Sequence, residues 1–190
     1  MAERGRDTGS DVTGTIEPGT GPLAAITEIR GLGMILIRAD LARAGDALAE
    51  AAGLAVPATT RFTTDGARWL GWMAPDELLL ILPAAETAET LAALRDALST
   101  EPALIEDVSA MRCVFDLSGP RAAEVLMKLT PADLSALPAD GVRRTRAAQV
   151  ACALWRHGDG WRVIAFRSIR DYLAEVLARA AAPGTGLAPR

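Results

Sequence analysis

Short runs of alternating apolar and polar residues recur between residue 23 and about residue 181, and stretches with a different spacing follow them. Alternation with a period of two is typical of β-strands, whereas apolar residues three and four positions apart indicate amphipathic helices. The order strand, turn, strand, helix is expected four times, over the ranges 25–53, 68–98, 104–129 and 149–181. Because each element is apolar mainly on one face, the pattern predicts an α+β fold in which antiparallel sheets are covered by helices.

Residues that begin or end helices stand where the spacing changes. Asp40 precedes the first helical stripe as a suitable N-cap, and Gly53 follows it as a suitable C-terminal cap. Pro120 suits the first turn of the third helix, because proline lacks a backbone donor that would have no partner there. Ser168 and Asp171 have the spacing of a capping box before the last stripe.

The repeat divides the chain into two ferredoxin-like halves, at about residues 23–100 and 101–181. The segment 130–146 interrupts the second half and is expected to be a long connection. The ranges 1–22 and 182–190 hold too little apolar surface to offset the entropy lost on ordering. Both ends are therefore predicted to be disordered tails.

Composition and charge narrow the class of protein. Half of the residues are apolar and the net charge is −4, which argues against a nucleic-acid partner because phosphate binding requires clustered positive charge. No apolar run reaches the roughly 18 residues of a membrane span, and the N-terminus lacks the pattern of a secretory signal. We therefore expect a cytoplasmic protein without a membrane partner, in which Cys113 and Cys152 are buried free thiols.

Side chains that carry catalysis are scarce. His157, the single histidine, lies in an expected hairpin turn, although every nucleophile would need it as its base. One histidine and two distant cysteines do not make a four-ligand zinc site. The segment 31–33 lacks the third glycine of a dinucleotide fingerprint and precedes a strand, whereas the fingerprint opens a helix. The sequence predicts no catalytic, cofactor-binding or metal-binding residue in this chain.

Two groups of side chains leave alternatives open. Four tryptophans lie in or beside expected strands: Trp69, Trp72, Trp155 and Trp161. They belong either to the protein's own core, which is the more common place for a strand tryptophan, or to an interface with a partner. Five arginines lie late in the chain: Arg143, Arg144, Arg146, Arg167 and Arg170. They are either solvated or anchor an acidic partner through bidentate contacts.

Four segments, in their order and spacing, resemble the gamma subunits of heterotetrameric sarcosine oxidase. Residues 69–77 resemble that family's Trp-Leu-Gly-Pro-Asp-Glu-type segment with extra residues before the proline, and parts of 107–121 resemble its central motif. Residues 131–134 fit its Cys-Pro-x-Asp-Leu segment, except that Thr130 replaces the cysteine. Residues 167–173 resemble its final Arg-Ser-Phe-x-Asp-Tyr-Leu helix start.

This resemblance implies a fold related to the folate-binding domain of the glycine-cleavage T protein. It also implies an assembly with alpha, beta and delta subunits, with alpha as the main partner. Such an enzyme oxidises sarcosine to glycine, forms hydrogen peroxide and transfers the one-carbon unit to tetrahydrofolate as 5,10-methylenetetrahydrofolate. FAD, FMN, NAD, tetrahydrofolate and zinc are then expected in the partner subunits, and this chain is expected to be a non-catalytic structural subunit.

Two alternatives remain open. The first is a stand-alone folate-binding protein of the aminomethyltransferase type, although such relatives are longer and the repair branch carries a Lys-Gly-Cys-Tyr-type motif that this chain lacks. The second is a generic ferredoxin-like binding module, which periodicity alone does not separate from the oxidase subunit. The order of the four motifs favours the oxidase subunit over both.

Overall fold

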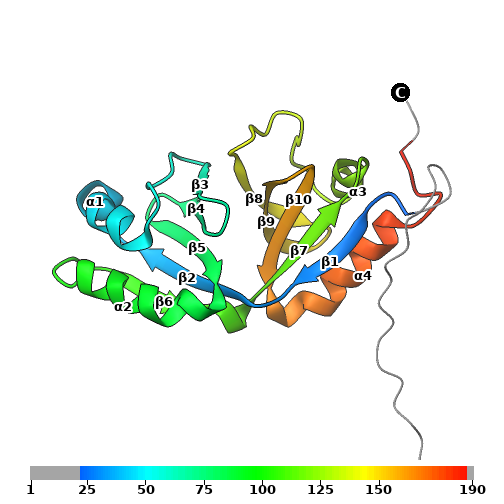
Figure 1. Ribbon diagram of the computed structural model, residues 1–190. Helices are drawn as coiled ribbons and strands as arrows, with labels where there is room; N and C mark the ends of the chain where they lie inside the picture. Colours follow the sequence, from blue (N-terminus) through cyan, green and yellow to red (C-terminus); the bar gives the residue numbers. More distant parts are fainter. Residues whose placement is uncertain (1–21, 188–190) are drawn as a thin grey trace, which may run out of the picture.

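The computed structural model describes residues 22–187, which form two five-stranded antiparallel sheets and four α-helices (Figure 1). The strands are β1 (Ala25–Ile29), β2 (Leu32–Arg38), β3 (Phe62–Thr64), β4 (Trp69–Ala74), β5 (Glu77–Pro83), β6 (Leu104–Asp107), β7 (Arg112–Ser118), β8 (Val142–Ala147), β9 (Val150–His157) and β10 (Gly160–Phe166). The helices are α1 (Leu41–Ala52), α2 (Thr87–Ala97), α3 (Ala122–Met127) and α4 (Arg170–Ala181), with short 3₁₀ turns η1 (Ala84–Glu86), η2 (Ser109–Met111) and η3 (Arg167–Ile169).

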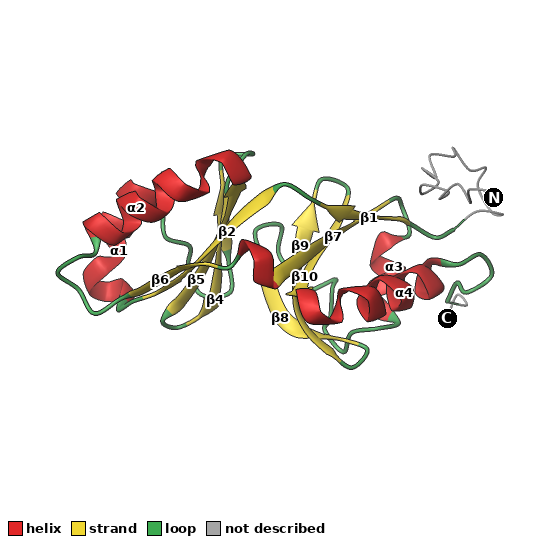
Figure 2. Ribbon diagram, turned by 90° about the horizontal axis from the view of Figure 1, so that it is seen from below, coloured by secondary structure: helices red, strands yellow, loops and turns green. Residues whose placement is uncertain are grey.

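The two sheets form the middle layers of a four-layer molecule (Figure 2). The first sheet has the order β3-β4-β5-β2-β6 and the second has the order β1-β7-β10-β9-β8. Helices α1 and α2 cover the outer face of the first sheet, and α3 and α4 cover that of the second (Figures 1 and 2). The inner faces of the sheets pack against each other. The predicted α+β fold with helix-covered antiparallel sheets is confirmed.

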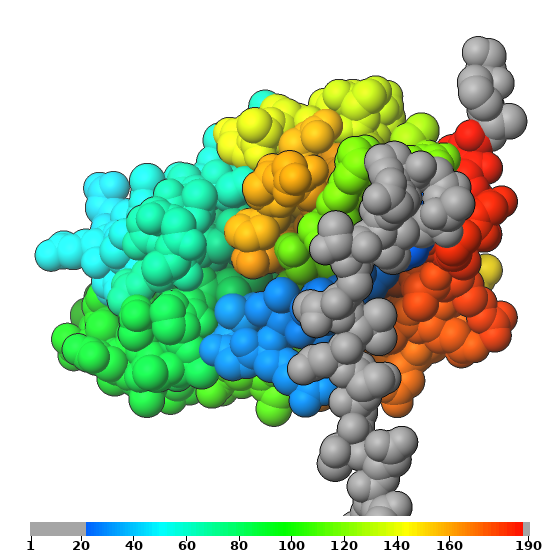
Figure 3. Space-filling model, turned by 45° about the vertical axis from the view of Figure 1, so that its right-hand side comes forward, coloured from blue at the N-terminus to red at the C-terminus, as the bar shows by residue number. Residues whose placement is uncertain are grey.

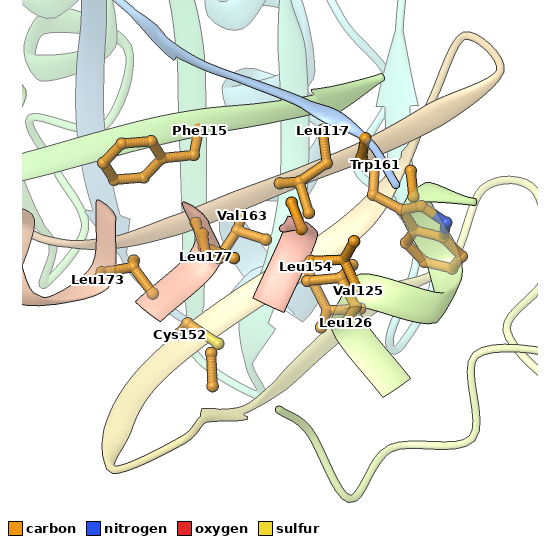
Figure 4. Packing of buried hydrophobic residues seen from close by; sticks show 14 of the residues in the cluster. Phe115, Leu117, Val125, Leu126, Cys152, Leu154, Trp161, Val163, Leu173 and Leu177 are labelled. Carbon is orange, nitrogen blue, oxygen red and sulfur yellow. The ribbon is translucent and has the colours of Figure 1, made fainter. Parts of the chain in front are cut away.

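Three apolar clusters hold these layers together. Leu48 of α1, Leu80 of β5 and Leu94 of α2 belong to the cluster outside the first sheet. The matching cluster outside the second sheet brings α3 and α4 onto β7, β9 and β10 (Figure 4). A third cluster between the sheets includes Leu79 from β5 and Ile164 from β10. The central strands therefore bury both faces, which explains why β5 is almost wholly apolar.

The first two strands do not form the hairpin that the repeat predicted. β1 pairs with β7 in the second sheet, and β2 pairs with β5 and β6 in the first. Gly31 has a φ of 73° and carries the chain from one sheet into the other. The hairpins expected within 25–38 and 104–117 are wrong. β7 pairs with β1 on one edge and with β10 on the other, and β6 pairs with β2 in the first sheet. Each half thus gives one strand to the other half's sheet, and a cut after residue 100 does not separate the sheets.

Two edge strands, β3 and β8, were not predicted. β8 lies in the segment expected to be a connection, and its sequence Val-Arg-Arg-Thr-Arg-Ala lacks apolar alternation. An edge strand tolerates such charges because one side of it faces solvent. The two edges meet at one corner of the molecule, where Arg61 and Gly141 form an isolated bridge and the amide of Phe62 donates to the carbonyl of Asp140 at 2.8 Å.

The predicted helix boundaries have different outcomes. The Asp40 side chain accepts from the amide of Ala42 at 3.0 Å, and Gly53 closes α1 with a φ of 69°, so both caps are confirmed. The capping box at Ser168 is wrong. The chain first makes η3, and α4 then begins after Ile169 without a side-chain cap.

The chain after α4 turns back onto α3. The Lys128 ammonium donates to the carbonyl of Thr185 at 2.8 Å, and Glu124 accepts from the amide of Leu187. Residues 182–187 are therefore held by α3, in contrast to the tail expected there. The rest of both predicted tails, residues 1–21 and 188–190, lies outside the described residues.

Candidate functional site

The residue types that carry catalysis do not gather in the described part of the chain. Among residues 22–187, no three His, Cys, Asp or Glu side chains lie close enough together to hold a metal ion. His157 lies exposed at the end of β9, where partial burial and the nearby charge of Arg162 lower the pKa of the imidazole. None of the described helices is long and apolar enough to cross a membrane.

Both cysteines are buried free thiols, as predicted. They lie in the apolar cluster outside the second sheet, where Figure 4 shows Cys152 beneath α4. Burial raises the pKa of Cys152 to about 12, and burial also raises the pKa of Cys113. Because the thiolate is the reactive form, both thiols are protonated and poorly reactive at neutral pH.

Three of the four tryptophans are core residues. Trp69 of β4 and Trp155 of β9 stack across the space between the sheets, with ring centroids 4.4 Å apart and an interplanar angle of 26°. Trp161 is buried in the cluster outside the second sheet (Figure 4), and Trp72 is half-buried outside the first. The core interpretation is confirmed for Trp69, Trp155 and Trp161.

One group of arginines surrounds a single carboxylate. The Glu28 carboxylate contacts Arg170 at 2.8 Å, Arg30 at 3.1 Å and Arg167 at 3.6 Å, and its side chain is only 9% exposed. The hydrogen bond from Arg170 is the largest cause that lowers the pKa of Glu28. The group lies beside the crossing from β1 to β2, which is exposed between the two halves of the molecule (blue in Figure 3).

A second charged group lies in a cleft of about 310 Å³ between the inner faces of the two sheets. Arg112 at the start of β7, Arg144 of β8 and Glu77 at the start of β5 line this cleft. Arg144 Nη1 donates to the carbonyl of Met73 at 3.0 Å and lies 3.9 Å from the Glu77 carboxylate. We call this cavity the inter-sheet cleft.

The late arginines singled out in the sequence are thus divided among three places. Arg167 and Arg170 lie at Glu28, Arg144 lines the inter-sheet cleft, and Arg143 and Arg146 are exposed on β8 without an ion pair among the described residues. Sequence reasoning missed Arg112 and Glu77 as neighbours. Each is a charged residue directly before a run of apolar strand residues, and that position is the one local signal that could have identified them.

Comparison with solved structures agrees with this architecture. One chain of the heterotetrameric sarcosine oxidase from Corynebacterium sp. U-96, solved in complex with pyrrole 2-carboxylate, matches with a TM-score of 0.80 at 31% identity over 88% of each chain. The glycine cleavage system aminomethyltransferase T from Bartonella henselae matches with a TM-score of 0.61 at 19% identity, over 83% of this chain and 46% of that one. The second likeness confirms the predicted relation to the T protein at the level of fold.

Comparison of sequences identifies the family. The sarcosine oxidase subunit gamma of Corynebacterium sp. (strain P-1) is 39% identical over 132 residues, which cover 66% of this chain and 64% of the relative. That of an Arthrobacter species is 37% identical over 152 residues, covering 76% and 73%. The matched region thus spans less than two thirds of the Corynebacterium relative's length. Residues 38–183 match the model described as the sarcosine oxidase, gamma subunit family. The chain therefore belongs to the sarcosine oxidase gamma subunit family.

Proposed function

We propose that this chain is the structural gamma subunit of a heterotetrameric sarcosine oxidase and supplies no catalytic, cofactor-binding or metal-binding residue of its own. The observation that carries this proposal is the match over 88% of each chain to a chain of a solved heterotetrameric sarcosine oxidase. Family membership over residues 38–183 supports it independently. The folded body, about residues 23–181, would then act through its shape and its surface.

In this proposal the partners are the alpha, beta and delta subunits, with alpha as the main contact, and the complex is cytoplasmic. Those partners hold FAD, FMN, NAD, tetrahydrofolate and zinc. The assembled enzyme oxidises sarcosine to glycine while oxygen is reduced to hydrogen peroxide. The carbon lost from sarcosine passes to tetrahydrofolate as 5,10-methylenetetrahydrofolate.

The chemistry of this chain's own side chains favours a structural role without catalysis. Its two thiols are buried in an apolar cluster and remain protonated, so neither is poised as a nucleophile. Its single histidine is exposed in a hairpin between β9 and β10. The stack of the buried rings of Trp69 and Trp155 joins the two sheets to each other.

Expression with and without the other subunits tests the proposal. We expect the isolated chain to be colourless and unable to oxidise sarcosine, and we expect it to co-purify in fixed stoichiometry when the alpha, beta and delta chains are present. Flavin absorbance, peroxide release and the mass of the complex are the measurements. A yellow isolated chain, or one that never joins the other three, would contradict the proposal, and tight binding of tetrahydrofolate by the isolated chain would favour the aminomethyltransferase alternative.

A further inference from the structure

The positive charges of the inter-sheet cleft exceed the negative charges that face them. Glu77 is the acidic residue that lines it, and that carboxylate is already shared between Arg144 at 3.9 Å and Arg38 at 3.7 Å. Arg112 forms no ion pair with any residue that the structure describes, and its buried Nε has no hydrogen-bond partner there. Burial lowers the pKa of Arg112, but a guanidinium stays charged at neutral pH. The cleft therefore holds a cation with incomplete compensation.

The two guanidinium groups are held in place before anything binds. The ring of Phe166 lies 3.9 Å from the guanidinium carbon of Arg112, and these two residues face each other across β7 and β10. The bond from Arg144 to the Met73 carbonyl fixes the second group. Binding an acceptor to such ordered donors costs little side-chain entropy.

The surroundings would strengthen a charged contact. Apart from its three charged residues, the cleft is lined mainly by apolar side chains: Met73, Leu79, Ala151, Ala153, Ile164 and Phe166. An anion that entered would lose water and meet the donors in a medium of low dielectric, where the attraction is larger than in bulk water. A carboxylate matches the planar, forked geometry of a guanidinium.

The rim has the composition of a protein interface. Phe166 is 43% exposed at the cleft, and Met111, next to Arg112 in the chain, is 54% exposed. Arg167 Nε donates to the carbonyl of Ala110 at 3.2 Å, which joins η3 to η2 and brings a further cation to this surface. Aromatic residues, methionine and arginine are the types enriched at interfaces. A free small carboxylate would leave the exposed apolar side chains uncovered, whereas a protein surface would cover them.

We propose that the inter-sheet cleft is a docking site for an Asp or Glu side chain of another subunit of the oxidase, which pairs with Arg112 and Arg144. This inference rests on the proposed function, because the occupant is a neighbour in the complex. The acidic side chain supplies negative charge that the cleft lacks, and the surface around it packs on Met111 and Phe166. The cleft then acts as a socket that fixes the orientation of the gamma subunit.

The test uses the whole complex, with the affinity of the full-length gamma chain for the alpha, beta and delta assembly as the readout. We expect Arg112→Met combined with Arg144→Gln to weaken that affinity by about 30-fold or more, as for the loss of a buried charge pair. Arg143→Gln is the control for Arg144→Gln: it removes one positive charge from an exposed residue on β8 that does not line the cleft, and it should change the affinity by less than about threefold. Raising the salt concentration should narrow the gap between wild type and the double variant.

Stability of the free chain separates docking from a structural role. Because Arg112→Met removes an incompletely compensated cation from the cleft, the isolated variant should melt at the same temperature as wild type or above it. Arg144→Gln alone, at a side chain that is 56% exposed, tests the proposal if the Arg112 variant does not fold. Wild-type affinity in both the double variant and Arg144→Gln would refute the proposed docking of an acidic side chain in the cleft, while leaving the proposed function intact. Failure of the wild-type chain to join the complex would overturn both.

Discussion

The stack of Trp155 on Trp69 is an aromatic contact between the two sheets. Trp155 is 1% exposed, so Trp155→Ala removes nearly all of a large buried aromatic group. Substitutions of this kind cost about 3–5 kcal/mol. A domain of ordinary stability has about 5–15 kcal/mol in total. We therefore expect the alanine variant to be only marginally folded.

Trp155→Phe should behave differently. Nε1 of Trp155 is buried and has no hydrogen-bond partner in the part of the chain that the structure describes. Phenylalanine removes that donor, which relieves about 1–3 kcal/mol of desolvation. It also loses part of the buried ring, worth about 1–2 kcal/mol. The two effects oppose each other, so the free energy of unfolding should stay within about 1 kcal/mol of wild type.

Urea unfolding of the full-length chain, followed by far-ultraviolet circular dichroism, measures these differences. Trp161→Phe is the matched control, because Trp161 is also buried but its Nε1 is not a buried donor without a partner. That variant loses ring area without any relief, and should therefore be less stable than Trp155→Phe. If Trp155→Phe is as damaging as Trp155→Ala, or more damaging than Trp161→Phe, the reasoning from the unpaired donor is refuted.

Three further results are expected. Gly160→Ala should destabilise the chain by about 1–3 kcal/mol, because a Cβ there would lie 2.1 Å from the carbonyl oxygen of Leu117; Gly45→Ala, in an open position of α1, should instead gain about 0.5–1 kcal/mol in the same urea titration. Glu28→Gln should be less stable than wild type at pH 7. Because the folded state lowers the pKa of Glu28, the difference in stability should shrink once the pH falls below about 4.5 and should vanish below the lowered pKa. Thermal melts at several pH values measure this difference, and a difference that does not change with pH would contradict the prediction. A thiol reagent at pH 7 should label Cys152 only as fast as the chain unfolds, and rapid labelling of the native chain would show that the thiol is accessible.

Local signals in the sequence predicted the helices well and the strand pairing poorly. Asp40 and Gly53 bound α1 because a cap depends on a few neighbouring residues. The partner of β1 depends instead on β7, which begins more than 80 residues later in the chain. Both β1–β2 and β1–β7 satisfy the same alternation, so periodicity does not distinguish them. For this reason the sequence pattern could not predict that β1 and β6 exchange between the sheets.

The candidate site was predictable only in part, for the same reason. The abundance of arginine late in the chain pointed to an acidic partner as one of two interpretations. The sequence did not reveal that Arg144 shares a cleft with Arg112, because Arg112 lies on β7 and Arg144 on β8, and β10 and β9 lie between these strands in the second sheet. Ser168 shows the opposite failure, where a correct local spacing was overridden by the 3₁₀ turn that precedes α4.

The exchange of strands links the packing of the fold to the chemistry of the cleft. Glu77 belongs to the first sheet, whereas Arg112 and Arg144 belong to the second, so their separation is set by how the sheets pack. That packing depends on the stack of Trp69 on Trp155, and β1 and β6 tie each half into the other half's sheet. A sheet that moved would carry Glu77 away from Arg144 and change the balance of charge in the cleft. The buried aromatic contact and the exposed charged cleft are therefore parts of one arrangement, in which the apolar core fixes the position of the charges.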